Sequence, residues 1–305
     1  MRTTIKIEPQ IRDKYNVCLI TIDSCRYDTA KSAATPTLDS LSKLKEAESH
    51  ATYTYPTHHS LFIGILPRLI GERASYIEGY DQIWRSSGVR ESDKKVFQTF
   101  HEPTIIKHYE DKGYNVQGCG GVNFFNPRLY CNSLCMLFTN FTYFGSEKFG
   151  DEYKTLPRKQ FLMPLGNVDK ITKSLEGTKP FFLFINCPET HIPYDTDEII
   201  INDKYVSLIK RLQHEHATKI HYNNGGGPFT KNEIDILHKA QIKALEYVDK
   251  KLKVLFSKLP NLYPTLFIIL GDHGEEFGEE GRFGHAHSSQ YVTKVPVWSG
   301  WVRRI

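Results

Sequence analysis

The stretch at residues 266–274, LFIILGDHG, decides the fold of this chain. Five apolar residues run without a break and are followed at once by Gly271, Asp272 and His273. A continuous apolar run of this length is typical of a strand that is buried on both faces of a parallel sheet. Since open α/β sheets bind ligands beyond the carboxyl ends of such strands, we expect Asp272 and His273 to lie in a site there.

A second apolar run, at residues 17–22, ends in the same way, in Asp23. The two runs come from opposite ends of the chain, yet both deliver a carboxylate at the end of a strand. If the two strands belong to one parallel sheet, Asp23, Asp272 and His273 meet at the same edge. Carboxylates and imidazoles are metal ligands, so the pattern predicts a metal-dependent enzyme.

Strand and helix patterns alternate along the rest of the chain. This alternation predicts an α/β fold with a mainly parallel sheet sandwiched between helices. Residues 66–100 and 195–229 follow neither pattern, and we expect both to be insertions into a single domain that spans residues 1–305. Strands are expected at residues 16–22, 114–118, 181–186 and 265–270, and helices at 37–47, 56–65, 102–112 and 230–258.

Composition limits the classes of function. The chain of 305 residues carries a net charge of +4 and has no block of basic residues, which argues against nucleic acid and slightly favours a small anionic substrate. No window approaches the ~20 apolar residues of a membrane span, and the N-terminus lacks the apolar region of a secretory signal. The six cysteines form no CxxC pair, as expected of reduced thiols in a cytoplasmic protein. Nothing in the composition predicts the oligomeric state.

Thr54 lies near the start of the helix expected at residues 56–65. A hydroxyl in this position faces free backbone N–H groups and the positive end of the helix dipole, which favour phosphate or sulfate. By itself a threonine there is more often a helix cap. A metal ion held by Asp23, Asp272 and His273 would lower the pKa of the Thr54 hydroxyl and make it a nucleophile.

Six blocks resemble, in order, those of the alkaline phosphatase/sulfatase superfamily and span nearly the whole chain. They are similar to the D-x-x-R-x-D metal block, the TPxLDxL helix, the nucleophile block, the KPFFL…HxPY segment, the DHG block and the closing VP strand. They lie at residues 23–28, 35–41, 54–58, 179–194, 271–274 and 295–297. The resemblance implies an alkaline-phosphatase-like α/β fold with Thr54 in the nucleophile position.

Two departures from sulfatases change the expected chemistry. Thr54 stands where sulfatases need the cysteine or serine that is oxidised to formylglycine, and His58 replaces the arginine of that block. His58 lies one helical turn from Thr54 on the same face, where we expect it to bind the substrate. A threonine here resembles phosphodiesterases and phosphoethanolamine transferases, and residues 272–285 are similar to the transferase pattern DHGESLGENG…LHG. Those transferases carry membrane helices, which this sequence lacks, so their lipid substrates are not expected.

The resemblance implies that Asp23, Thr54, Asp272 and His273 bind a divalent metal ion. A shell of carboxylates, imidazole and hydroxyl suits Zn²⁺ or Mn²⁺, with Mg²⁺ or Ca²⁺ as alternatives. We expect one ion at this site.

His191 and His285 are the remaining candidates, and the resemblance implies that both are catalytic and bind the oxygens of the substrate. A second metal ion is less favoured, because two-zinc relatives have an aspartate four residues before the first of these histidines and this chain has Cys187. The histidines at positions 214, 216 and 221 lie in an expected insertion, and residues 275–280 form an acidic run. Both groups are expected to be solvated. The alternatives are that the three histidines bind a metal ion and that one glutamate of the run reaches the metal.

The sequence favours a metal-dependent hydrolase or transferase that acts on a phosphoester, or a phosphonate ester, through Thr54. Two alternatives stay open. One is a sulfate-ester hydrolase that works without formylglycine. The other is a non-catalytic member of the fold that binds an anion or a partner protein, against which the intact ligands and nucleophile argue.

Overall fold

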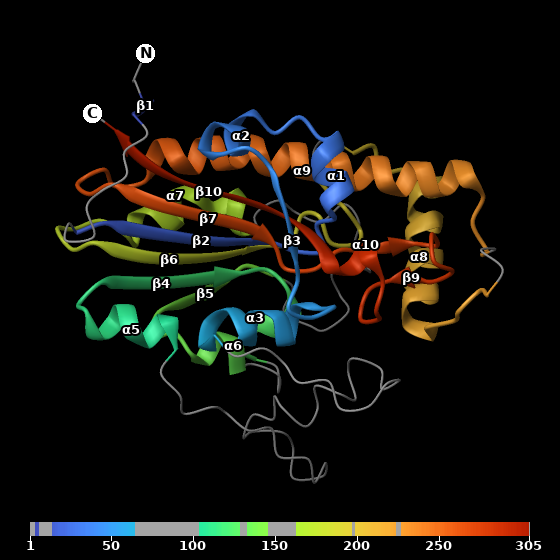
Figure 1. The fold of residues 1–305 in the computed structure, drawn as a ribbon, viewed down its shortest axis with the longest axis horizontal. Helices are drawn as coiled ribbons and strands as arrows, with labels where there is room; N and C mark the ends of the chain where they lie inside the picture. Colours follow the sequence, from blue (N-terminus) through green and yellow to red (C-terminus); the bar gives the residue numbers. More distant parts are fainter. Residues whose placement is uncertain are drawn as a thin grey trace, which may run out of the picture.

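The computed structural model describes residues 4–5, 14–64, 104–128, 133–145, 163–196, 199–223 and 227–304. In this part of the chain an eight-stranded sheet has the order β1-β10-β7-β2-β6-β4-β5, and β3 also pairs with β10 (Figure 1). The pairings among β7, β2, β6, β4 and β5 are parallel, and those of β10 are antiparallel. The sheet is therefore mainly parallel, as predicted. Its strands are β1 (Thr4–Ile5), β2 (Asn16–Ile22), β3 (Lys45–Glu48), β4 (Asn115–Gly120), β5 (Phe141–Tyr143), β6 (Phe181–Cys187), β7 (Thr265–Gly271) and β10 (Lys294–Arg304).

The strand β2 is apolar without a break because both faces of the sheet are covered. Cys18 and Ile20 pack into one hydrophobic cluster, whereas Val17 and Leu19 pack into another, as the alternation of side chains along a strand requires. Figure 1 shows helices on both faces, so the sandwich is confirmed. One face carries α1 (Tyr27–Ser32), α2 (Pro36–Leu41), α7 (Val168–Lys173) and α9 (Lys231–Lys258), and the other carries α3 (Thr54–Ile63), α5 (Ile105–Asp111) and α6 (Ser133–Met136).

The described part of residues 195–229 packs against the rest of the protein more closely than the sequence predicts. Their middle part forms α8 (Asp203–Thr218), and Leu208 and Leu212 of this helix pack with Phe277 and Phe283 in a third hydrophobic cluster. The two phenylalanines belong to a small hairpin that follows β7 at the carboxyl end of the sheet. The remaining elements are η1 (Asn123–Phe125), η4 (Pro164–Asn167), β8 (Glu276–Phe277), β9 (Phe283–Gly284) and α10 (Gln290–Thr293). The insertion expected at 66–100 lies outside the described residues.

Two helix predictions need correction. The helix expected at 37–47 is confined to α2, and residues 45–48 form β3, which pairs with residues 294–297 of β10. Pairing with the edge of the sheet overrides the helical preference of Lys, Glu and Ala. The helix expected at 56–65 begins at Thr54 and ends at Ile63. Pro56 does not block this start, since the N–H groups of a first helical turn have no partner within the helix.

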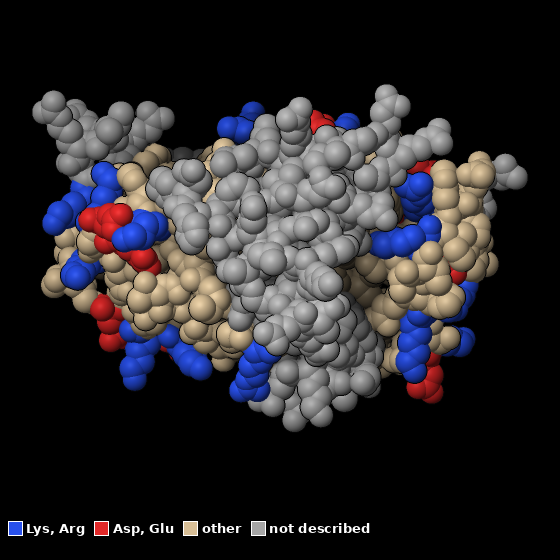
Figure 2. Space-filling view, turned by 90° about the horizontal axis from the view of Figure 1, so that it is seen from below, with Lys and Arg blue, Asp and Glu red and all other residues tan. Residues whose placement is uncertain are grey.

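None of the described helices has the length and apolar character needed to cross a membrane. On the face seen in Figure 2, the described Lys and Arg side chains occur together with Asp and Glu side chains.

Candidate metal and catalytic site

Asp23, Asp272 and His273 meet at the carboxyl edge of the sheet. The strands β2 and β7 are parallel neighbours with Ile22 opposite Gly271, so the two aspartates that follow leave the sheet side by side. Ligand atoms of Asp23, Asp272 and His273 lie within 4.8 Å of one another, and all three side chains are fully buried. The structure therefore brings together three groups that the sequence predicts from two distant strand ends.

The surroundings of Asp272 fit a bound cation. Its Oδ1 accepts hydrogen bonds from the backbone N–H groups of Ser24 and His273, at 3.1 and 2.8 Å. Its Oδ2 is buried and has no hydrogen-bond partner among the described residues. Burial and the charge of Asp23 raise the pKa of Asp272 well above its usual range. A divalent cation beside both carboxylates would satisfy the unpaired oxygen and remove their repulsion.

Thr54 is the first residue of α3 and completes this group. Its hydroxyl oxygen lies 3.3 Å from Asp23 Oδ2 and 3.3 Å from His273 Nε2. The N-cap of α3 is Tyr53, so the interpretation of Thr54 as a helix cap is wrong. The Thr54 side chain instead points at the candidate metal ligands, from the positive end of the helix.

His58 lies beneath Thr54 and is fully buried. Its Nδ1 donates a hydrogen bond to the Thr54 carbonyl at 2.7 Å, since a carbonyl can only accept, and its Nε2 accepts one from the Thr21 hydroxyl at 2.8 Å. Burial lowers the pKa of His58 to about 4, so the ring is neutral at pH 7. With both ring nitrogens bound inside the protein, His58 is not placed where the sequence predicts, against a substrate. It holds the first turn of α3.

His191 and His285 lie beside the candidate metal ligands. The ring centroid of His285 is 4.6 Å from that of His273 and 5.2 Å from that of His191. Nδ1 of His191 faces a backbone carbonyl at 2.7 Å, and Nδ1 of His285 lies 3.1 Å from Glu275 Oε1. In both rings these contacts leave Nε2 as the nitrogen that can meet a substrate.

Two residues that the sequence assigns to solvated segments lie in this region. Glu275 is fully buried, and burial together with a neighbouring aspartate raises its pKa to about 8. The ring centroid of His216, on α8, is 4.3 Å from that of His285. The sequence could have indicated His216, because it follows the buried Leu212 by four residues and so lies on the same face of the helix. His214, by contrast, is exposed.

The rest of the acidic run is partly buried: Glu279 and Glu280 are exposed, as the sequence predicts, whereas Glu276 is not. Glu276 is buried, with Oε2 3.0 Å from His287 Nε2. The buried Arg26 donates to Glu279 at 2.6 Å and to both oxygens of Asp28. The sequence does not show the contact between Arg26 and Glu279, because the two residues lie far apart along the chain.

Comparison with known proteins agrees with this architecture. The sulfatase family model matches residues 15–299. No curated protein matches the chain by sequence. Among solved structures, the chain is similar to lipooligosaccharide phosphoethanolamine transferase A of Neisseria meningitidis, with a TM-score of 0.59 and 14% identity over 98% of this chain and 50% of that one. It therefore spans about half the length of the Neisseria protein.

Two further structures show the same likeness. One is the phosphonate monoester hydrolase of Agrobacterium radiobacter, with a TM-score of 0.61 and 14% identity over 95% of this chain and 68% of that one. The other is the C-terminal periplasmic domain of the phosphoethanolamine transferase EptC of Campylobacter jejuni, with a TM-score of 0.54 and 12% identity over 94% of this chain and 79% of that one. Likeness at this identity shows the fold, whereas the family model covers nearly the whole sequence. The chain belongs to the sulfatase family, within the alkaline phosphatase/sulfatase superfamily.

Proposed function

We propose that the chain is a metal-dependent hydrolase or transferase that cleaves a small anionic phosphoester, or a phosphonate ester, with Thr54 as the nucleophile. The observation that carries the proposal is the position of the Thr54 hydroxyl oxygen, 3.3 Å from both Asp23 Oδ2 and His273 Nε2. The names of the Neisseria and Agrobacterium proteins describe reactions at phosphorus, which supports a phosphorus ester here too.

The chemistry starts at Thr54. A divalent ion held by Asp23, Asp272 and His273 would supply the positive charge that favours an alkoxide and stabilises the ester oxygens. The Thr54 hydroxyl gives up its proton to solvent water as its oxygen attacks phosphorus, and the bond from phosphorus to the leaving alcohol oxygen breaks. The N-terminus of α3 faces the negative charge that develops on the phosphoryl oxygens. His58 keeps Thr54 in position through the bond to its carbonyl.

The two histidines beside the site complete the cycle. His191, the more exposed of the two, protonates the leaving oxygen, and His285 donates to a non-bridging oxygen through Nε2. His191, now one proton short, then takes a proton from water as the water oxygen attacks the phosphothreonine. The bond from phosphorus to Thr54 breaks, and the Thr54 oxygen regains a proton from solvent. An acceptor alcohol in place of water would make the same reaction a transfer.

Zn²⁺ or Mn²⁺ suits the donor set of this site best. The structure of the Escherichia coli EptC domain, described as a complex with Zn, supports zinc. A cytoplasmic location stays a prediction, and so does the absence of nucleic-acid partners. The names of the Campylobacter and Escherichia relatives describe periplasmic domains, so a measured location has to decide between the two compartments.

A panel of p-nitrophenyl esters tests the proposal. Phosphate monoester, diester, phosphonate ester and sulfate ester are each offered to the protein loaded with Zn²⁺ or Mn²⁺. We expect turnover of a phosphorus ester, and a loss of roughly 10³-fold or more in Thr54→Ala. Thr172→Ala is the matched control, because the Thr172 hydroxyl bonds to the Val168 carbonyl within α7 and not to the site.

Each other result has a definite meaning. Turnover of the sulfate ester alone would favour the sulfate-ester hydrolase. No turnover of any ester by the metal-loaded protein would favour the non-catalytic alternative. Full activity in Thr54→Ala would show that the nucleophile is another group.

A further inference from the structure

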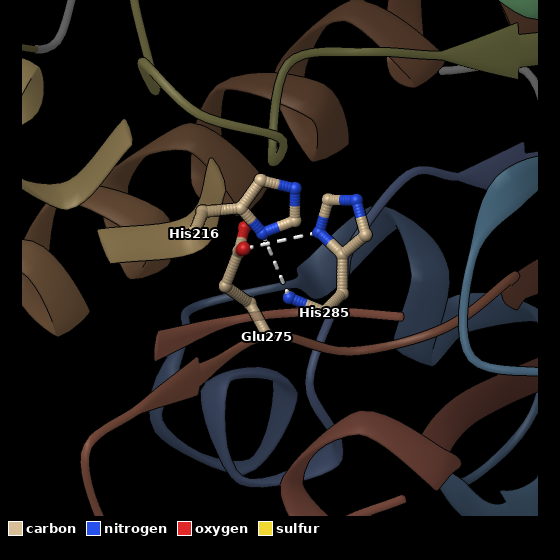
Figure 3. A group of neighbouring side chains, drawn as sticks. All are labelled: His216, Glu275 and His285. Carbon is tan, nitrogen blue, oxygen red and sulfur yellow. Dashed lines mark hydrogen bonds and ion pairs between the residues drawn. The ribbon is translucent and has the colours of Figure 1, made fainter. Parts of the chain in front are cut away.

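A second group of ligand side chains lies next to the first. Ligand atoms of His216, Glu275 and His285 are within 4.8 Å of one another. His216 comes from α8, Glu275 from the loop after β7, and His285 from the residue after β9. Figure 3 shows the two imidazoles and the carboxylate converging on one point.

The contacts within this group bring the ligand atoms together. Nδ1 of His285 lies 3.1 Å from Glu275 Oε1. The backbone N–H of His285 donates to His216 Nδ1 at 3.2 Å, a bond that a cation at this nitrogen would replace. The Glu275 carboxylate is held from its other side, because the Tyr194 hydroxyl donates to Oε2 at 3.3 Å. Arg26 also donates to the Glu275 backbone carbonyl at 3.2 Å. The carboxylate is thus fixed in place and fully buried.

Gly284 gives independent evidence that this group is built into the fold. Its φ of +90° lies in the region that favours glycine. A Cβ at this position would lie 1.9 Å from His216 Nδ1, so the imidazole packs directly against the glycine backbone. Any side chain at position 284 would push His216 away from Glu275 and His285.

We propose that His216, Glu275 and His285 bind a second divalent cation. Two imidazoles and one carboxylate are the protein ligands of zinc sites that keep an open position for water or substrate, so Zn²⁺ is the ion that this set suits. The ring of His285 is 4.6 Å from that of His273, which places the second cation beside the first. The sequence favoured a single ion because it showed no aspartate near His191; the carboxylate comes instead from Glu275.

This inference is compatible with the proposed function but goes beyond it. A cation bound at Nδ1 of His285 leaves the Nε2–H free to donate to a substrate oxygen. Two adjacent cations would let one stabilise the attacking oxygen and the other the ester oxygens, a division of work suited to phosphorus esters.

Counting bound zinc tests the second site without reliance on activity. Wild-type protein is stripped with a chelator, titrated with Zn²⁺, freed of excess ion and analysed for metal per chain. We expect two ions in wild type and one in His216→Ala. His214→Ala is the matched control, since His214 is exposed on the same helix, and should keep both. Asp272→Asn should lose the other ion and keep this one.

Two outcomes separate this inference from the proposed function. One ion in wild type that is lost only in Asp272→Asn would overturn the second site and leave the nucleophile and its metal in place. Two ions in both wild type and His216→Ala would also overturn it, because the second ion would then have other ligands. Glu275→Gln gives the same test from the opposite side of the group, and far-UV circular dichroism checks that each variant is folded.

Discussion

Replacement of His58 by phenylalanine tests whether His58 positions Thr54 or binds the substrate. Phenylalanine keeps a ring among Phe62, Phe125 and Phe184, whose centroids lie 5.0–6.0 Å from that of His58. The hydrogen bonds to the Thr54 carbonyl and the Thr21 hydroxyl are lost. The hydroxyl keeps a contact with Asn186 Nδ2 at 3.4 Å, and a carbonyl in a first helical turn also accepts from the helix backbone.

Because the Thr21 hydroxyl and the Thr54 carbonyl each keep another partner, His58→Phe removes two hydrogen bonds but leaves neither group unpaired. At about 0.5–1.5 kcal/mol for each bond, we expect His58→Phe to lower the free energy of unfolding by about 1–3 kcal/mol. The larger effect falls on catalysis, because a shift of the nucleophile by about 1 Å costs roughly 10²-fold in rate. We expect that fall in kcat with KM nearly unchanged.

Urea unfolding and steady-state kinetics on the same preparations provide the assay. Phe62→Leu is the control, since it disturbs the same aromatic cluster and leaves both hydrogen bonds of His58 intact. It should lose stability and keep kcat. A rise in KM with kcat unchanged in His58→Phe would refute the reasoning, because it would mean that His58 touches the substrate after all.

Three further predictions concern stability. His59 is buried, and burial lowers its pKa to about 3. Between pH 6.5 and about 3 the unfolded chain therefore binds more protons than the folded one, and the free energy of unfolding falls as the pH falls. His59→Phe should reduce the slope of that free energy against pH by up to about 1.4 kcal/mol per pH unit. Chelation should lower the Tm of wild type. Without metal at pH 7, Asp272→Asn should have a higher Tm than wild type, because one of two adjacent buried carboxylates is gone. A lower Tm for metal-free Asp272→Asn would contradict the assigned cation site. Asp249 accepts from two backbone N–H groups at the start of α2, at 3.1 and 2.8 Å, so Asp249→Ala should cost about 1–3 kcal/mol for each group in urea unfolding without changing kcat.

Much of the site was predictable because its metal-ligand residues come directly after two strands in the sequence. The apolar runs that become β2 and β7 are unbroken because helices cover both faces, and each run ends in an aspartate. Parallel pairing then brings Asp23 and Asp272 together without any further information. Thr54 was predictable for a similar reason, since a helix start at the same edge of the sheet points its first residues at the strand ends.

The parts that were missed depend on contacts between distant segments. His216 reaches the site only because α8 packs on the hairpin after β7, and Gly284 makes the room for its ring. Glu275 reads as part of a solvated acidic run until Tyr194 and His285 are placed beside it. Residues 45–48 carry good helix formers, and only their pairing with β10 makes them a strand.

The stereochemistry at phosphorus tests the central claim, attack by Thr54, most directly. A substrate that is chiral at phosphorus is hydrolysed by the metal-loaded wild-type protein, and the configuration of the product is determined. Transfer to Thr54 followed by transfer to water consists of two in-line displacements, so the account predicts net retention. Net inversion would contradict it, because a single displacement would mean that water attacks phosphorus without a phosphothreonine.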